Sequence, residues 1–257
     1  MARVRAIVAY DGTDFAGFQR QTNAPTVQGA LEQALATIGQ PGRVLAAGRT
    51  DAGVHATGQV IAFDVDWPHP LEELQRALNA VLPEAIAIWE VAWAAPDFHP
   101  RFQARSRTYR YTLYNAPVRD PLRRRTAYHV AAPLDVGAMQ EAARFLVGEH
   151  DFAAFGRPPK GENTVRRVLR AEWSAQRPLI TFEIEATAFL YRMVRRIVGT
   201  LLPVGWGKVG PEHVAEVLAS RDPSLAGPTV PPHGLCLVAV SYPETENSET
   251  RIPNARS

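Results

Sequence analysis

The stretch 48–59 reads Gly48-Arg49-Thr50-Asp51-Ala52-Gly53-Val54-His55-Ala56-Thr57-Gly58-Gln59 and lies between two segments with the apolar pattern of short strands, 43–47 and 60–66. A β-hairpin needs only about two to five loop residues, whereas this connection uses about a dozen. It carries Arg, Asp, His and Gln at separate places, between glycines that let a backbone or a ligand approach closely. An ordinary loop with a surface aspartate is the alternative, but the length and the mixture favour a functional loop built around Asp51.

The segments around this loop predict one α+β unit in the first half of the chain. Residues 4–10 and 86–91 have the pattern of strands, and helices are expected after Thr26 and from Pro70. Each helix has an apolar stripe, formed in the first by Val27, Leu31, Ala34, Leu35 and Ile38 and in the second by Leu71, Leu74, Leu78 and Val81. The order strand-helix-strand-strand-helix-strand is the ferredoxin-like pattern.

The second half alternates helices and strands in a similar way. Strands are expected at 108–114, 164–173, 179–188 and 235–240, and helices at 135–147, 189–202 and 211–221. Because the composition changes at 96–110, we place a domain junction there. We therefore expect an N-terminal α+β domain over 1–104 with the Asp51 loop, a C-terminal α+β domain over 105–242, and a polar, disordered tail over 243–257.

Length and composition limit the class of protein. The chain has 257 residues, a length that suits two domains of ordinary size. Its net charge is small, at +2. Cys236 is the only cysteine, so an internal disulfide framework and a multi-cysteine zinc site are excluded, and a reducing compartment is favoured. Since no apolar stretch approaches about 18 residues, we expect a soluble, cytoplasmic protein without membrane association.

Basic and aromatic side chains occur together in two places. The junction 96–110 carries Arg101, Arg105 and Arg107 among Phe, His and Tyr residues, a mixture suited to a polynucleotide, although a solvated linker would look similar. The loop 15–21 presents Phe18 and Gln19, which could stack on and hydrogen-bond to RNA bases. The alternative for Phe18 is that it covers the edge of the core.

The predicted helix 189–202 combines an apolar face with a basic one. Arg192, Arg195, Arg196 and Gly199 recur at helical spacing opposite the apolar residues. This face is either an ordinary solvated surface or a site for phosphate groups or a carboxylate.

Three of these regions resemble the signature regions of the tRNA pseudouridine synthase A family: 47–55 around Asp51, 109–115 beginning with Tyr109-Arg110-Tyr111, and 189–199 around Arg195. The resemblance implies isomerisation of uridines at positions 38, 39 and 40 of the tRNA anticodon stem-loop. In that reaction the N-glycosidic bond breaks, the base rotates, and it is rejoined through C5 without a cofactor or a metal. The resemblance further implies two ferredoxin-like or RRM-like halves that share a mostly antiparallel sheet around a central RNA-binding cleft. It also implies a homodimer that contacts the anticodon stem-loop and the elbow of tRNA.

The resemblance also assigns roles to individual residues. Asp51 corresponds to the nucleophile, which attacks uracil C6 or ribose C1′ or assists glycal formation; these routes stay open. Arg195 corresponds to its ion-pair partner, for which we expect bidentate geometry, with Arg49 as a local backup. Tyr109 stacks on the target base or acts as the general base. The expected substrate contacts are Arg49, His55, Gln19, Phe18, Arg101, Arg105, Arg107 and Arg192.

Three other interpretations of these residues are a metal site, a non-catalytic RNA-binding protein and a pseudouridine synthase for another RNA. Asp51 and His55 could belong to a metal site, but metal sites usually need three or four ligands and no further cluster is visible nearby. A non-catalytic RNA-binding protein would have no need for the Asp51 loop, so Asp51→Ala should cost it nothing. A pseudouridine synthase for ribosomal or small nuclear RNA would share the aspartate chemistry, and dependence on the tRNA elbow would separate it from a tRNA enzyme.

Overall fold

The computed structural model describes residues 1–158 and 161–243. The first half of the chain forms β1 (Ala2–Tyr10), α1 (Val27–Thr37), β2 (Leu45–Ala46), β3 (His55–Val65), α2 (Leu71–Val81) and β4 (Ile86–Trp93). The predicted order of strands and helices is therefore confirmed. Thr26 caps α1, as expected, because its side chain accepts a hydrogen bond from Gly29 N–H. Of the predicted tail, only Pro243 lies within the described residues.

The second half forms β5 (Ser106–Asn115), β6 (Tyr128–Val130), α3 (Val136–Arg144), β7 (Gly148–Asp151), β8 (Val165–Gln176), β9 (Leu179–Ala186), α4 (Met193–Gly205), α5 (His213–Ser220) and β10 (Leu235–Ser241). Short 3₁₀ turns occur at Pro121–Arg123, Ala153–Phe155 and Pro232–Gly234. Asp135 caps α3, and β8 and β9 are antiparallel neighbours. Both features were predicted, since each depends on short-range sequence.

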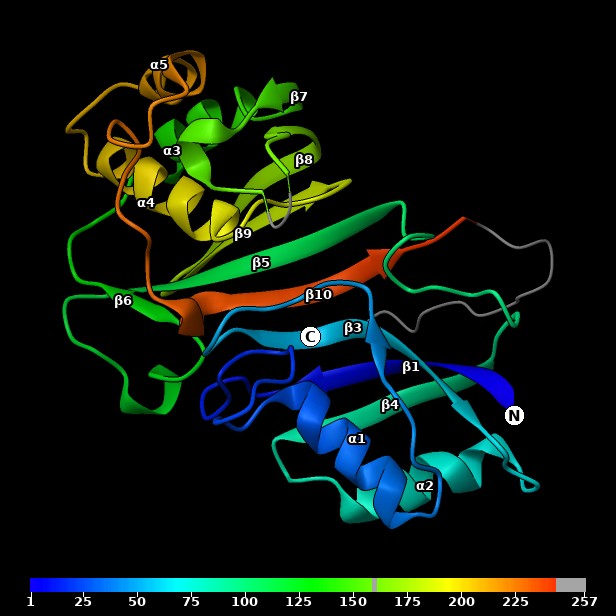
Figure 1. Cartoon of the computed structure of the whole chain (residues 1–257). Coiled ribbons are helices and arrows are strands. Elements are labelled where there is room, and N and C mark those ends of the chain that lie inside the picture. Colours follow the sequence, from blue (N-terminus) through cyan, green and yellow to red (C-terminus); the bar gives the residue numbers. More distant parts are fainter. Residues whose placement is uncertain (159–160, 244–257) are drawn as a thin grey trace.

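One sheet runs through the whole molecule (Figure 1). Its strand order is β4-β1-β3-β10-β5-β9-β8-β7, with β2 attached to β3 and β6 to β5. Only the β3–β10 and β5–β6 pairs are parallel among the described strands. The fold is therefore α+β with a large, mixed, mostly antiparallel sheet, which confirms the fold class at this level.

The last strand, β10, joins the two halves. It lies between β3 and β5, and its parallel pairing with β3 consists of Cys236 with His55 and Leu237 with Ala56. Gly58 permits the close approach of these strands, because a Cβ there would collide with the carbonyl oxygen of Val238. This pairing places the start of β10 beside the start of β3, which directly follows the Asp51 loop.

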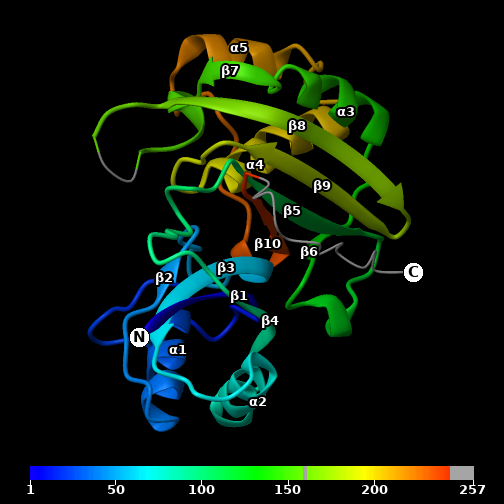
Figure 2. The same ribbon diagram turned by 90° about the vertical axis from the view of Figure 1, so that its right-hand side faces the viewer.

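Helices cover the two ends of the sheet separately. Figures 1 and 2 show α1 and α2 beside β1, β3 and β4, and α3, α4 and α5 around the half formed by β5, β7, β8 and β9. Leu74 and Leu78 of α2 are buried, as the periodicity predicts, but Val81 is 40% exposed. The prediction for Val81 was wrong because α2 ends there, before its last apolar position reaches the core.

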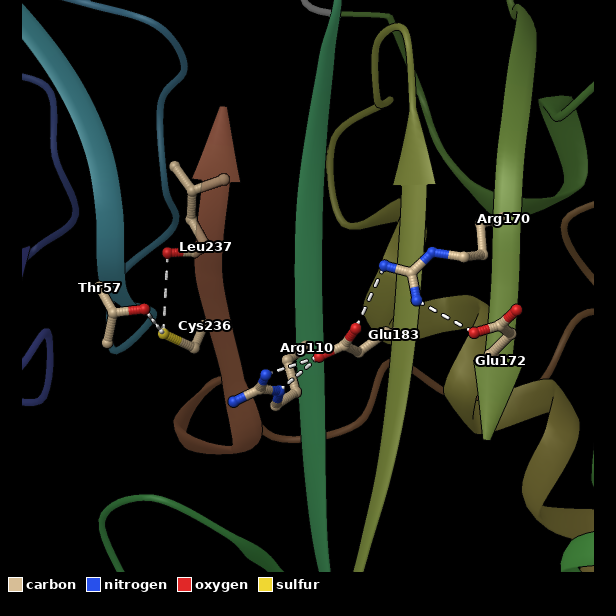
Figure 3. A network of polar contacts seen from close by, with 7 residues as sticks. All are labelled: Thr57, Arg110, Arg170, Glu172, Glu183, Cys236 and Leu237. Carbon is tan, nitrogen blue, oxygen red and sulfur yellow. Dashed lines mark hydrogen bonds and ion pairs between the residues drawn. The ribbon is translucent and has the colours of Figure 1, made fainter. Parts of the chain in front are cut away.

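A ladder of ion pairs crosses the second half of the sheet (Figure 3). Glu183 on β9 contacts Arg110 on β5 at 2.6 Å and Arg170 on β8 at 3.2 Å, and Arg170 also contacts Glu172 at 3.0 Å. Burial alone would raise the pKa of Glu183, but the hydrogen bonds from Arg110 and Arg170 outweigh it and lower that pKa. Because Arg110 alternates with buried Tyr109 and Tyr111, it faces the side of the sheet opposite to those rings.

Candidate active site

The loop of Asp51 is shorter than predicted, because β3 already begins at His55. Backbone hydrogen bonds from the segment 15–18 hold it: Phe18 N–H donates to Thr50 O at 3.1 Å, and Gly53 N–H donates to Phe15 O at 3.3 Å. Gly17, at φ 99°, allows this contact, since a Cβ there would lie 2.8 Å from Thr50 O. The segment 15–18 therefore supports the loop with its backbone.

Buried polar side chains fasten the same loop from the sheet. The hydroxyl groups of Tyr10 and Thr50 share a hydrogen bond of 2.8 Å, and Gln59 Nε2 donates to Gly48 O at 2.9 Å. Sequence reasoning assigned no role to Tyr10 or Gln59. Gln59 was expected in the loop 48–59, whereas the structure places it in β3 with 0% of its surface exposed, where a buried amide needs hydrogen-bond partners.

The loop carries Asp51 to Arg195, which lies in the first turn of α4. Arg195 Nη1 donates to Asp51 Oδ2 at 3.2 Å, and Arg195 Nε donates to the carbonyl oxygen of Val230 at 2.8 Å. The side chains of Arg195 and Asp51 are only 11% and 21% exposed. The expected bidentate geometry is wrong, because the guanidinium divides its donors between the carboxylate and a backbone carbonyl.

Tyr109 lies on β5, close enough to Asp51 for the charge of that carboxylate to act on its phenol. Its ring meets Phe189 edge to face, with the ring centroids 5.0 Å apart. Burial raises the pKa of Tyr109, and the negative charge of Asp51 raises it further. The phenol therefore stays protonated at neutral pH.

Comparison with known proteins identifies the family of this chain. A family model described as tRNA pseudouridine synthase matches residues 6–103 and 142–243. A tRNA pseudouridine synthase A from Chloroflexus aurantiacus is 51% identical over 250 residues, covering 95% of this chain and 90% of that protein. One from Geobacter sulfurreducens is 45% identical and covers 94% of this chain and 100% of its own. The chain belongs to the tRNA pseudouridine synthase A family.

Among solved structures, a Cbf5-Nop10-Gar1 complex matches 77% of this chain and 45% of the matched chain, at 14% identity and a TM-score of 0.36. That similarity is too low to support an argument about this member of the family.

Three residues expected to contact substrate form contacts within the protein. Phe18 is 2% exposed and packs against Tyr10, so it belongs to the core. His55 is buried. Its Nδ1 accepts a hydrogen bond from Gly12 N–H at 3.0 Å and lies 3.1 Å from an Asp11 carboxylate oxygen. Its Nε2 donates to the carbonyl oxygen of His233 at 3.1 Å. For these two residues the expectation is wrong, because folding buries Phe18 in the core beside Tyr10 and buries His55 between Gly12 and His233.

Arg107 is the third such residue. Its guanidinium donates to the carbonyl oxygens of Ala47, Arg101 and Thr187 at 2.9, 2.7 and 3.0 Å. It thus ties the start of the Asp51 loop to the segment before β5 and to the end of β9. Arg107 thus cross-links the backbone, and its contact with RNA stays a prediction.

The remaining expected contacts are exposed. They are Gln19, Arg49, Arg101, Arg105 and Arg192. Arg192 does not share a helical face with Arg195, because α4 begins only at Met193 and Arg192 adopts φ 62° in front of it. Its guanidinium lies over the ring of Tyr191, 4.8 Å from the centroid. Gly199 is buried rather than part of a basic surface.

The described residues contain neither a metal-binding cluster nor a membrane-spanning helix. Within 1–158 and 161–243, no group of three His, Cys, Asp or Glu residues is placed to hold a metal ion. No helix in that part of the chain is long and apolar enough to cross a membrane.

Proposed function

We propose that this chain converts uridine to pseudouridine at positions 38, 39 and 40 in the anticodon stem-loop of tRNA, with Asp51 as the nucleophile. In this reaction the N1–C1′ bond breaks, a C1′–C5 bond forms, C5 loses its proton to solvent, and N1 gains one. The observation that carries the proposal is the partly buried pair of Asp51 and Arg195, whose members are 144 residues apart in the chain.

The geometry around Asp51 supports different roles for its two carboxylate oxygens. Arg195 holds Oδ2, whereas Oδ1 accepts no hydrogen bond from any residue in the described part of the chain. We therefore assign the attack to Oδ1, with Arg195 orienting the carboxylate and supplying a positive charge beside it. The chemistry needs no cofactor or metal in this scheme.

The function is tested with unmodified tRNA that carries tritium at C5 of uridine. Incubated without metal or cofactor, the protein should release tritium to water. The amount released should match the number of uridines at positions 38, 39 and 40. Transcripts with cytidine at these positions are the matched control. Tritium release that persists from the control transcripts would reject the proposed positions. If no tRNA released tritium, the proposed enzymatic activity would be rejected.

Tyr109 is proposed to contact the target base as a neutral phenol. If a phenolate were the general base, kcat would rise about tenfold per pH unit between pH 7 and pH 9, because the raised pKa lies above that range. We expect no such rise, since the protonated form is already the active one. The measurement is kcat from pH 6.5 to pH 9, with Tyr109→Phe as the variant that keeps the ring; a tenfold rise per unit that Tyr109→Phe abolishes would restore the general-base role.

The target uridine lies in a stem-loop and has to leave its stack, which costs a few kcal/mol that protein contacts must offset. We propose that the exposed side chains of Arg49, Arg101, Arg105 and Arg192, with Gln19, contact the RNA around the flipped base. We further propose that the RNA lies in a central cleft between two ferredoxin-like halves, 1–104 and 105–242, and that both the anticodon stem-loop and the elbow are contacted.

We also propose that the enzyme works in the cytoplasm as a homodimer, as the family resemblance implies. Sedimentation equilibrium at micromolar concentration should give twice the chain mass of 28.2 kDa. A mass of one chain at the concentration used for the assay, with full activity, would reject the dimer and leave the proposed reaction intact.

A further inference from the structure

A short segment links the two partners of the Asp51–Arg195 pair to one another. Residues 227–234, which we call the strap, precede β10. At its start, Gly227 N–H donates to Thr200 Oγ1 of α4 at 2.8 Å, and a Cβ at Gly199 would collide with the carbonyl oxygen of Pro228. The strap therefore lies directly against α4, the helix that carries Arg195.

Three carbonyl groups of the strap accept hydrogen bonds from side chains of three different elements. Val230 O accepts from Arg195 Nε of α4 at 2.8 Å, Pro231 O from the Tyr111 hydroxyl of β5 at 2.8 Å, and His233 O from His55 Nε2 of β3 at 3.1 Å. Val230 N–H also donates to Arg195 O at 3.3 Å. The strap is thus anchored to the sheet on both sides of β10 and to α4.

The strap also contacts the loop of Asp51. Gly53 has φ 75°, and a Cβ there would lie 2.9 Å from the Pro232 ring. Pro232 follows Pro231 and is two residues from Val230, so the same short stretch that orients Arg195 also limits the position of the loop. Proline restricts φ at both positions, which makes this stretch stiff.

Tyr111 is the rigid end of this arrangement. Its side chain is 0% exposed, it lies in β5 between two neighbouring strands, and Gly234 lies against its ring, where a Cβ would be 2.7 Å from Cζ. Its hydroxyl donates to the carbonyl oxygen of Pro231, and the preceding residue, Val230, provides the carbonyl oxygen that accepts from Arg195. A shift of Pro231 would move Val230, and with it the acceptor of Arg195 Nε.

We propose that Tyr111 is a positioning residue: its hydroxyl fixes the strap at Pro231 and thereby orients the Arg195 guanidinium toward Asp51. This inference rests on the proposed function. Burial raises the pKa of Tyr111 against the opposing effect of the Arg195 charge, so that the phenol remains protonated and keeps its donor.

The test compares two tyrosines that each donate to a proline carbonyl. Tyr111→Phe removes the bond to Pro231 O, and Tyr242→Phe removes an equivalent bond of 2.7 Å to Pro100 O, at the far end of β10. We expect Tyr111→Phe to lower kcat for tritium release about tenfold with KM for tRNA changed less than twofold, since small misplacement of a catalytic group affects the reacting geometry most. Tyr242→Phe should leave kcat unchanged. Equal kcat values for Tyr111→Phe and wild type would overturn the proposal.

A double-mutant cycle separates this role from a general loss of stability. If Tyr111 acts through Arg195, adding Tyr111→Phe to Arg195→Lys should lower kcat less than twofold further, whereas independent effects would multiply. Multiplied effects would overturn the proposal. If Tyr111→Phe is too unstable to assay, Thr200→Val is the second variant, because it removes the hydrogen bond at the other end of the strap. Thr200→Val should also lower kcat. An unchanged kcat for Thr200→Val would overturn the role of the strap. Release by the wild type in the same experiment establishes the proposed function independently.

Discussion

Asp51→Ala and its isosteric counterpart Asp51→Asn are expected to abolish release of C5 tritium from tRNA. Loss of a nucleophile removes the covalent route, so kcat should fall by roughly 10⁴-fold or more. Affinity for tRNA should change little, because the phosphate contacts that dominate RNA binding lie on arginine side chains. Single-turnover release and filter binding on the same preparations measure the two quantities separately.

The matched control for this variant is Asp64→Asn on β3. Asp64 is also a carboxylate paired with an arginine, with Arg3 Nε 2.6 Å from its oxygen, but it lies at the opposite end of that strand. It should leave kcat within about twofold of wild type, since most surface substitutions away from a site have small effects. Activity of Asp51→Asn within tenfold of wild type would remove Asp51 as the nucleophile.

Arg195→Met is expected to have the second largest effect. It leaves the Asp51 carboxylate without its cationic partner in a site that is largely shielded from solvent, so kcat should fall about 10²- to 10³-fold. Arg195→Lys should be intermediate, because lysine keeps the charge but cannot reproduce a planar group that donates through Nη1 to Asp51 and through Nε to Val230 at once. In both variants turnover should fall more than affinity for tRNA.

Arg196→Lys is the control from the next position of the same helix. Arg196 points elsewhere and donates through Nη1 to Ala154 O at 3.4 Å. Its replacement should leave kcat nearly unchanged even if the protein is less stable. If Arg195→Met retained full turnover, the pairing role would pass to Arg49, which is exposed and forms no ion pair with any carboxylate in residues 1–158 and 161–243.

Local patterns carried most of the correct predictions. The helix after Thr26 and the alternation of Tyr109 and Tyr111 on β5 depend on neighbouring residues, whose periodicity can be read directly. The start of α4 was misplaced because Phe189–Arg192 continue the helical periodicity. In the folded chain, Tyr191 pairs with Arg157 and Arg192 takes a left-handed conformation instead. Periodicity alone does not report such a competing contact.

From residue patterns alone it follows that a charged, glycine-rich loop presents Asp51 and that Arg195 belongs to an amphipathic helix, and both regions resemble one family of enzymes. Which other residues serve the site depends on contacts that form only in the folded chain. His55 and Phe18 became part of the scaffold, while Tyr111 and the strap came to lie against Arg195 and the Asp51 loop. The contacts of His55 with His233, Tyr111 with Pro231 and Gly53 with Pro232 join residues more than a hundred positions apart, because β10 inserts between β3 and β5. Such long-range pairing depends on the packing of the whole sheet and leaves no periodic signal in the sequence.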